Sequence, residues 1–291
     1  MLSAYVEVSP VKFAKMQGNG NDFIILDNRE EKLSQGKIQT IAIKLCRRRL
    51  SIGADGLIVL DAPTNSNSSF SMQLLNKDGS ESPFSGNAAR CAARFAYEKK
   101  IAERQMTFDT KGGVIKAQVE PPLVTLELGK LDTSKIVLDK TFNYMDESLP
   151  VNYMHLGWPQ SSPHCVVFLE KNDWRPMESL APFARAIQKN KELFPDGVNV
   201  NFLKILDHYA IEVYTYERGV DEFTLSCGSG SVAAAIAAWI NGWCDSPVEV
   251  YNPGGTNTII VEPTCNENLL AVKLRGKTAL VAEGTVFPEA L

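Results

Sequence analysis

Hydrophobic and polar positions alternate along most of the chain, as in strands that bury one face. Residues 70–75, 106–119 and 124–128 carry this pattern. Apolar residues recur at helical spacing in fewer places, at residues 38–50 and 182–190. The pattern therefore predicts a chain in which strands and hairpins outnumber helices.

The chain is organised around residues 216–239, which combine a cysteine, a glycine-rich turn and a helix of small residues. A strand is expected to end at 223–226, and Cys227 stands where it breaks into Gly-Ser-Gly; a helical pattern follows from Ser231. The first amides of a helix are free and the helix dipole is positive there, which favours a thiolate and binds an anion. The turn is a candidate site for both a base and a carboxylate.

The same element occurs earlier in the chain, so the sequence contains an internal duplication. The aligned pairs are Ser85 with Cys227 and Gly86 with Gly228 at one shift, and Asn76-Lys77 with Glu217-Arg218 at a shift one position shorter. The second copy thus has one extra residue before Cys227. A duplication of this length predicts two similar domains, for which we expect residues 1–143 and 144–276, with the polar stretch 132–149 as connector.

Composition excludes several classes of protein. The chain has 291 residues, of which 44% are hydrophobic and 22% charged, so two domains with real cores are expected rather than disorder. A formal net charge of -4 argues against a nucleic-acid or anionic-membrane partner. The start of the chain lacks signal-peptide features, and no apolar run reaches membrane-spanning length. We expect a cytoplasmic protein, and the sequence leaves a homodimer open.

The six cysteines form no C-x-x-C motif and no paired Cys/His spacing. A disulfide framework and a zinc site are therefore not expected, and most of the thiols should lie in the core. Only Cys227 has a sequence context that would activate it.

Five candidate positions have a structural interpretation as well as a functional one. Ser85 is a good helix N-cap, worth about 1 kcal/mol, and Asn21 can bond within its own Gly-Asn-Gly turn. A lone histidine such as His164 is more often structural than catalytic. The adjacent Glu217-Arg218 fits a surface ion pair of little energy as well as a clamp for a zwitterion.

Several ordered motifs give the chain a specific resemblance. They are GNGNDF, NKDGSESPFSGNAARC, the SPH turn before CVVFLE, FPDGVNVNF, and YERG followed by CGSGS. Over nearly its whole length the chain resembles the diaminopimelate epimerase family, cofactor-independent amino-acid racemases of lysine biosynthesis with two opposed cysteines. The resemblance implies an α+β fold of two pseudo-symmetric domains, each a mainly antiparallel sheet wrapped round a central helix. It also implies that the C-terminal strand, about 277–291, returns to the first domain.

The resemblance also implies roles for residues. Cys227 matches the second catalytic cysteine, Ser85 stands at the position of the first, and His164 and Glu217 match polar neighbours that help a thiol lose its proton. The implied substrate-binding positions are Asn21, Asn76, Gly86, Asn87, Ser162, Asn199, Glu217, Arg218, Gly228 and Ser229, of which Gly86-Asn87 and Gly228-Ser229 hold the α-carboxylate. The implied reaction removes a proton from one face of Cα and returns one to the other, with no pyridoxal phosphate and no metal.

The sequence departs from the family pattern at three places. Ser85 replaces a cysteine, and a hydroxyl is far less acidic than a thiol of pKa ~8.5. Either a cysteine was replaced to trap a complex, or the chain uses a natural Ser/Cys pair. Ser162 replaces an asparagine, and the loop before Cys227 is longer by one residue. These last two differences leave open diaminopimelate, or another amino acid such as histidine or lysine, as the substrate.

Two other function classes fit parts of the sequence. GSGSVA after a strand and before a helix matches a dinucleotide-binding fingerprint, but it lies late in the chain and hairpin strands follow it, unlike a series of βαβ units. A catalytically silent binding protein would keep the fold and the carboxylate site, and Ser85 is the feature that supports it.

Overall fold

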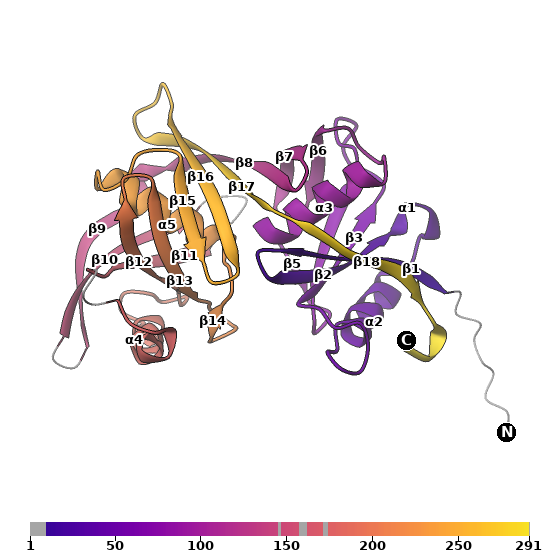
Figure 1. Cartoon of the computed structure of the whole chain (residues 1–291), viewed down its shortest axis with the longest axis horizontal. Coiled ribbons are helices and arrows are strands. Elements are labelled where there is room, and N and C mark those ends of the chain that lie inside the picture. The colour runs from indigo at the N-terminus through magenta and orange to yellow at the C-terminus, as the bar shows by residue number, and fades with distance from the viewer. Residues whose placement is uncertain (1–9, 145–146, 157–161, 171–173, 291) are drawn as a thin grey trace.

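A computed structural model describes residues 10–144, 147–156, 162–170 and 174–290. Figure 1 shows two lobes joined by long strands, with the end of the chain returning beside its beginning. Within the described ranges, no helix is long and apolar enough to cross a membrane.

The first lobe contains the strands and helices of the N-terminal half. Its strands are β1 (Val11–Gly18), β2 (Asn21–Asp27), β3 (Gly56–Asp61), β4 (Ser71–Asn76), β5 (Glu81–Ser82), β6 (Gln105–Thr110), β7 (Gly113–Glu120) and the start of β8 (Leu123–Asp132). Its helices are α1 (Asn28–Glu31), α2 (Gln35–Leu45) and α3 (Gly86–Glu98). The C-terminal strand β18 (Ala279–Val286) also lies here, antiparallel to β1, and a 3-10 turn follows at Pro288–Ala290.

The second lobe repeats this order. After a 3-10 turn at Thr133–Lys135, its strands are β9 (Val137–Tyr144), β10 (Glu147–Leu156), β11 (Ser162–Phe168), β12 (Asn199–Asp207), β13 (Ala210–Tyr216), β14 (Phe223–Thr224), β15 (Val248–Asn252), β16 (Gly255–Pro263) and β17 (Leu269–Lys277). Its helices are α4 (Met177–Lys189) and α5 (Gly228–Ile240).

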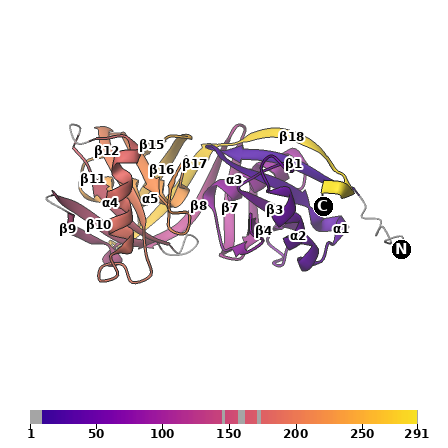
Figure 2. The ribbon, with the colours of Figure 1, turned by 90° about the horizontal axis from the view of Figure 1, so that it is seen from below.

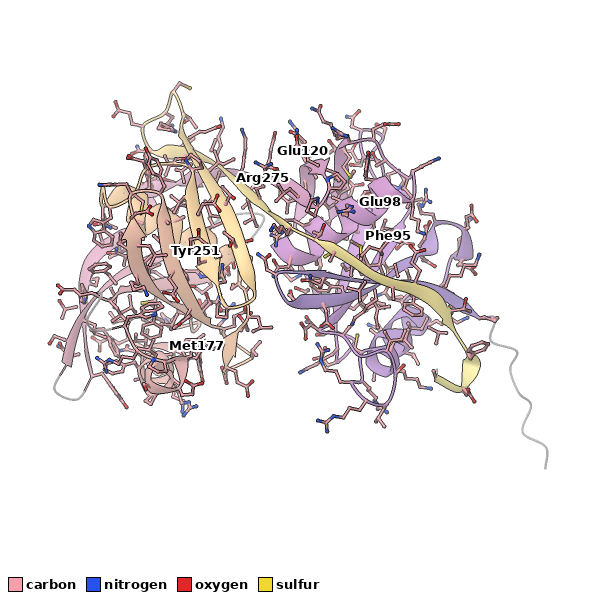
Figure 3. All side chains as sticks on the ribbon, in the orientation of Figure 1. Phe95, Glu98, Glu120, Met177, Tyr251 and Arg275 are labelled. Atoms are coloured by element: carbon pink, nitrogen blue, oxygen red, sulfur yellow. The ribbon has the colours of Figure 1, made fainter. Side chains whose placement is uncertain are left out.

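Strand pairing has the same pattern in both halves. The parallel pair β2 and β3 corresponds to β11 and β12, and the parallel pair β4 and β6 corresponds to β13 and β15. The halves meet where β8 runs antiparallel to β17, and there Arg275 Nη2 lies 3.3 Å from Glu120 Oε2 (Figure 3). The α+β fold of two pseudo-symmetric units is therefore present, and its strands form one continuous sheet across both lobes.

Helices α3 and α5 lie at the centre of the two lobes because their residues are small and apolar enough to be enclosed. Nearly every residue from Gly228 to Ala238 is buried, and α3 buries all its residues from Gly86 to Ala93. Alanine has no side-chain entropy to lose in a helix and lets strands approach closely. Both helices join one hydrophobic cluster with residues of the enclosing strands.

Helices α2 and α4 cover the outer side of each lobe, as Figures 1 and 2 show. Each packs one apolar face on a separate cluster, α2 through Ile38, Ile41 and Leu45, and α4 through Phe183 and Ile187. The helical spacing predicted these faces, although α2 ends at Leu45, earlier than the predicted 38–50, and α4 begins before its Pro182.

Two expectations about the chain are wrong. Residues 132–149 are no polar connector, because β9 pairs with β10 inside the second lobe. The turn expected at 161–164 is already strand from Ser162 onward, where β11 pairs with β10; Ser161 lies outside the described residues. The predicted division at 143/144 falls at the end of β9.

Candidate active site

A cleft of about 880 Å³ is lined by residues of both lobes. With one exception, the predicted site residues line it: Asn21, Asn76, Ser85, Gly86, Asn87, Ser162, Asn199, Glu217, Arg218, Cys227, Gly228 and Ser229. The exception is His164, which is fully buried and does not line the cleft. The two halves of the duplication thus contribute to a single site.

The N-termini of α3 and α5 meet at this cleft. Ser85 and Cys227 are the N-cap residues: Ser85 Oγ accepts from Ala88 N–H at 3.4 Å, and Cys227 Sγ accepts from Gly230 N–H at 3.3 Å. A Cβ added to Gly228 would lie 3.7 Å from the Cα of Gly86. Two helix dipoles and the free amides of two first turns therefore converge on one point, which suits an anion.

The thiol of Cys227 is protonated at rest in this environment. Burial raises its pKa well above the ordinary value, and the negative charge of Glu217 raises it further, against hydrogen bonds from Ser229 and the Gly230 N–H. The pKa of Cys227 is therefore raised, whereas the sequence predicted that the helix start alone would favour a thiolate. The cause is depth, since the Cys227 side chain is almost fully buried.

Glu217 lies within hydrogen-bonding reach of the Cys227 thiol. Burial raises the pKa of this carboxyl, although hydrogen bonds from Thr224 and Cys227 oppose the rise. Thr224 Oγ1 donates to Glu217 Oε1 at 2.7 Å, which fixes the carboxylate toward the cleft. The Glu217 carboxylate is therefore placed to accept the thiol proton.

His164 contacts Ser162 and Asn201. Asn201 Nδ2 donates to the Cys165 carbonyl at 3.0 Å and to His164 Nδ1 at 3.1 Å, so the imidazole proton is on Nε2. Nε2 then donates to Ser162 Oγ at 2.9 Å. Burial lowers the pKa of His164 to about 3, so the ring is neutral. The predicted role of His164 beside the thiol remains a prediction, since its described contacts lead to Ser162.

Asn76, Asn199 and Arg218 also line the cleft, and each is held by a hydrogen bond. Asn199 Oδ1 accepts from the Arg218 N–H at 2.8 Å, and Arg218 Nη1 donates to the Asp196 carbonyl at 2.7 Å. Asn76 Nδ2 donates to Ser80 Oγ at 3.0 Å. Within the described chain, Glu217 and Arg218 form no ion pair with each other, and both residues line the cleft.

A charged cluster next to Asn21 was not among the predicted site residues. Asn21 Nδ2 donates to Asp55 Oδ2 at 2.8 Å rather than within its own turn, and Arg48 donates to both Asp55 and Asp22. Burial of Asp22 is outweighed by hydrogen bonds from Arg48 and Lys15, which lower its pKa to about 2. The signal available in the sequence was that Asp55-Gly56 aligns with Asp196-Gly197 at the same shift as Asn76-Lys77 with Glu217-Arg218.

A buried network of hydrogen bonds joins the lobes behind the cleft. Asn19 Nδ2 donates to Asn257 Oδ1 at 2.8 Å, and Asn87 Nδ2 donates to the Ser226 carbonyl at 3.2 Å. Arg90 Nη2 donates to Asn87 Oδ1 at 2.6 Å. The sequence pattern did not single out Arg90, because a charged residue in a helix usually faces water.

Residues that could hold a metal do not gather here. Over the described part of the chain there is no group of three or more His, Cys, Asp or Glu side chains arranged for an ion.

Comparison with known proteins identifies the family of the chain. The sequence profile described as Diaminopimelate epimerase matches residues 13–133 and 159–278. A diaminopimelate epimerase of Aquifex aeolicus (strain VF5) is 34% identical over 288 residues, 97% of this chain and 99% of that protein.

Solved structures resemble the fold at low sequence identity. A PhzF-family phenazine biosynthesis protein of Bacillus anthracis has a TM-score of 0.70 at 15% identity, covering 96% of this chain and 100% of the other. A probable proline racemase of Agrobacterium radiobacter K84, solved with bound carbonate, has a TM-score of 0.66 at 15% identity, covering 96% and 95%. With the profile matching both halves, the chain belongs to the diaminopimelate epimerase family, which are isomerases independent of pyridoxal phosphate.

Proposed function

We propose that this protein inverts the α-carbon of diaminopimelate, from the LL to the meso form, with Cys227 as its catalytic thiol. One observation carries the proposal: the N-caps of α3 and α5, Ser85 and Cys227, meet in a single cleft. A carboxylate bound to the amides of Gly86-Asn87 and Gly228-Ser229 presents its Cα between the two caps. Inversion needs an acid and a base on opposite faces of that carbon.

The proton path begins at Glu217. Its carboxylate takes the Cys227 thiol proton, and the resulting thiolate removes the proton from Cα on its own face. The negative charge that develops on the substrate carboxylate is stabilised by both helix N-termini. Burial of Glu217 supports this path, because a carboxyl with a raised pKa is a stronger base.

The direction of the Ser162 hydrogen bond supports a second carboxylate in the substrate. Ser162 Oγ already accepts from His164 Nε2–H, so its own proton is available to a ligand in the cleft. Together with the Arg218 guanidinium, this offers donors to the far end of the substrate. Diaminopimelate carries a carboxylate there, whereas lysine and histidine do not.

Another amino acid is the alternative substrate. Its support is the shorter side chain of Ser162 where relatives are expected to have asparagine, and the extra residue before Cys227. The hydroxyl of Ser85 supports a further alternative, a binding protein that retains the fold with impaired catalysis.

We also infer that the enzyme acts in the cytoplasm on a free amino acid. All six cysteines are unpaired thiols, which fits a reducing compartment, and the net charge of -4 fits neither nucleic acid nor anionic membrane.

The test is a panel of L-amino acids and both diaminopimelate stereoisomers, incubated with the chain carrying Ser85 and with Ser85→Cys and analysed by chiral chromatography. We expect Ser85→Cys to convert LL- to meso-diaminopimelate and to leave lysine and histidine unchanged. Inversion of another amino acid in preference to diaminopimelate would refute the proposed substrate.

A further inference from the structure

Arg90 is a fully buried charge with almost no partner. It lies at the start of the second turn of α3 and has no exposed surface. Its Nη2 donates to Asn87 Oδ1, but Nε and Nη1 have no hydrogen-bond partner, and no carboxylate of the described residues pairs with it. Charged groups that are buried are almost always paired, because desolvation is costly. An unpaired guanidinium in this position needs an explanation.

Glycines from both lobes make room for this side chain. A Cβ on Gly276 of β17 would lie 2.8 Å from Arg90 Cζ, and one on Gly18 of β1 would lie 3.5 Å from Nη2. The guanidinium therefore occupies the seam where a strand of the second lobe passes α3. Any larger residue at Gly276 would displace it.

One unpartnered nitrogen of Arg90 lies beside Gly86, the first residue of α3. Its Nη1 lies 4.0 Å from the position of a Cβ on Gly86, and Leu274 of β17 packs against both Gly86 and Gly228. Burial lowers the pKa of Arg90 to about 10, so it keeps its charge at neutral pH. A full positive charge thus lies near the two positive helix ends, and no carboxylate of the described residues pairs with it.

Arg90 also sets the orientation of Asn87. Because the guanidinium only donates, Asn87 must turn its Oδ1 to Arg90 and its Nδ2 outward. That Nδ2 donates to the carbonyl of Ser226, the residue before Cys227, and lies 3.4 Å from Asn21 Oδ1. A chain of contacts therefore leads from Arg90 in one lobe to the cysteine turn in the other.

We propose that Arg90 is a positioning residue that completes the carboxylate site: its unbalanced charge draws the substrate α-carboxylate to the junction, and its bond to Asn87 holds the two half-sites in register. This inference rests on the proposed function. The charge is balanced when the carboxylate binds, and its effect grows as negative charge develops on that group.

The experiment compares Arg90→Met, which keeps bulk without charge, with Arg90→Lys, which keeps charge. Arg94→Met is the matched control, one turn further along α3, where Arg94 pairs with Glu98. Calorimetry measures binding of LL-diaminopimelate, and α-proton exchange in deuterium oxide measures catalysis. We expect Arg90→Met to weaken binding roughly 10- to 100-fold and to slow exchange further at saturation. Arg90→Lys should restore most of the binding, and Arg94→Met should match wild type.

Thermal melting without ligand separates this role from a structural one. Removing an unpaired buried charge should leave the melting temperature of Arg90→Met at or above that of wild type. A marked fall in melting temperature, failure of Arg90→Met to fold, or unchanged affinity in Arg90→Met would each overturn the inference. If wild type does not bind diaminopimelate, the proposed substrate fails and the inference about Arg90 fails with it, whereas binding by wild type with unchanged affinity in Arg90→Met overturns the inference alone.

Discussion

At the scale of single residues, the same cap position carries a thiol in one half and a hydroxyl in the other. Ser85 Oγ and Cys227 Sγ each accept an amide N–H of their own helix, so both residues satisfy the structural need for an N-cap. Proton transfer in catalysis also requires an acidic group, and a hydroxyl is a much weaker acid than a thiol. The two residues should therefore differ in chemistry while being alike in structure.

Ser85 should make the chain a one-sided catalyst. Cys227 can remove the α-proton it faces, with Glu217 as acceptor for the thiol proton, but Ser85 cannot readily return a proton from the other side. In deuterium oxide one stereoisomer should exchange its α-proton with retention, while net inversion is several orders of magnitude slower than in Ser85→Cys. Cys227→Ala should abolish the exchange. Inversion by the wild-type chain at a rate close to that of Ser85→Cys would show a competent Ser/Cys pair.

His164 should make folding stability depend on pH. Its folded pKa is about 3, below the ordinary value, so between those two values the unfolded chain binds a proton that the folded chain does not. The contribution of His164 to the free energy of unfolding is fully present above about pH 6.5. It falls as pH decreases, by up to about 1.4 kcal/mol per pH unit between about pH 6 and pH 4.

The measurement is denaturant unfolding at several pH values for wild type and His164→Gln. The variant should lose less stability between pH 7 and pH 5, and His155→Gln, at an exposed position, is the control. Equal pH slopes for wild type and His164→Gln would contradict the assignment of a neutral buried ring.

At the scale of elements, the hydrophobic pattern was sufficient to predict a helix or strand that buries a whole face. The runs in α3 and α5 were recognised because both follow a cap residue and a glycine, and the duplication reinforced each from the other. Strand β9 was missed because Phe142 is its one buried hydrophobic residue among those described, so the hydrophobic alternation is absent. Arg90 and Asn257 were missed because part of their environment comes from the other lobe, Gly276 beside Arg90 and Asn19 beside Asn257. The local sequence pattern around either residue does not contain these contacts.

Two hairpin turns form a contact between the lobes that tolerates no side chain. A Cβ on Gly254 would lie 2.2 Å from the carbonyl oxygen of Asn19, and Gly254 N–H donates to the Leu225 carbonyl at 2.7 Å. Gly254→Ala should therefore push the turns apart and destabilise the protein by about 1–3 kcal/mol.

Differential scanning calorimetry tests this effect, with Gly36→Ala as control because a Cβ there meets nothing within 4 Å. Gly254→Ala should lower the melting temperature and Gly36→Ala should not. A melting temperature of Gly254→Ala equal to wild type would mean that the turns can separate at no cost.

At the scale of the whole molecule, the active site exists because two copies of one unit face each other. Each lobe supplies one helix start, and strands β8 and β17 run between the lobes as an antiparallel pair. The cleft is lined from both sides, so its volume depends on the angle between the lobes. A motion about the strand pair would change the distance between Asn76 and Ser85 on one side and Arg218 on the other.

We expect the lobes to close on a bound substrate. Closure excludes water from the Cys227 turn, which strengthens the pull of the helix dipoles on the carboxylate and protects the reactive carbanion. Its driving force is contact made only in the closed form, between a ligand held at the helix starts and Arg218 at the far end. Small-angle scattering should therefore give a smaller radius of gyration for the wild-type chain with saturating diaminopimelate than without it. Arg218→Met should melt like wild type, since Arg218 is exposed and its described side-chain bond is to one carbonyl, yet show less contraction. An unchanged radius with ligand demonstrably bound would mean that the cleft is preformed and that specificity resides in the fixed positions of its side chains.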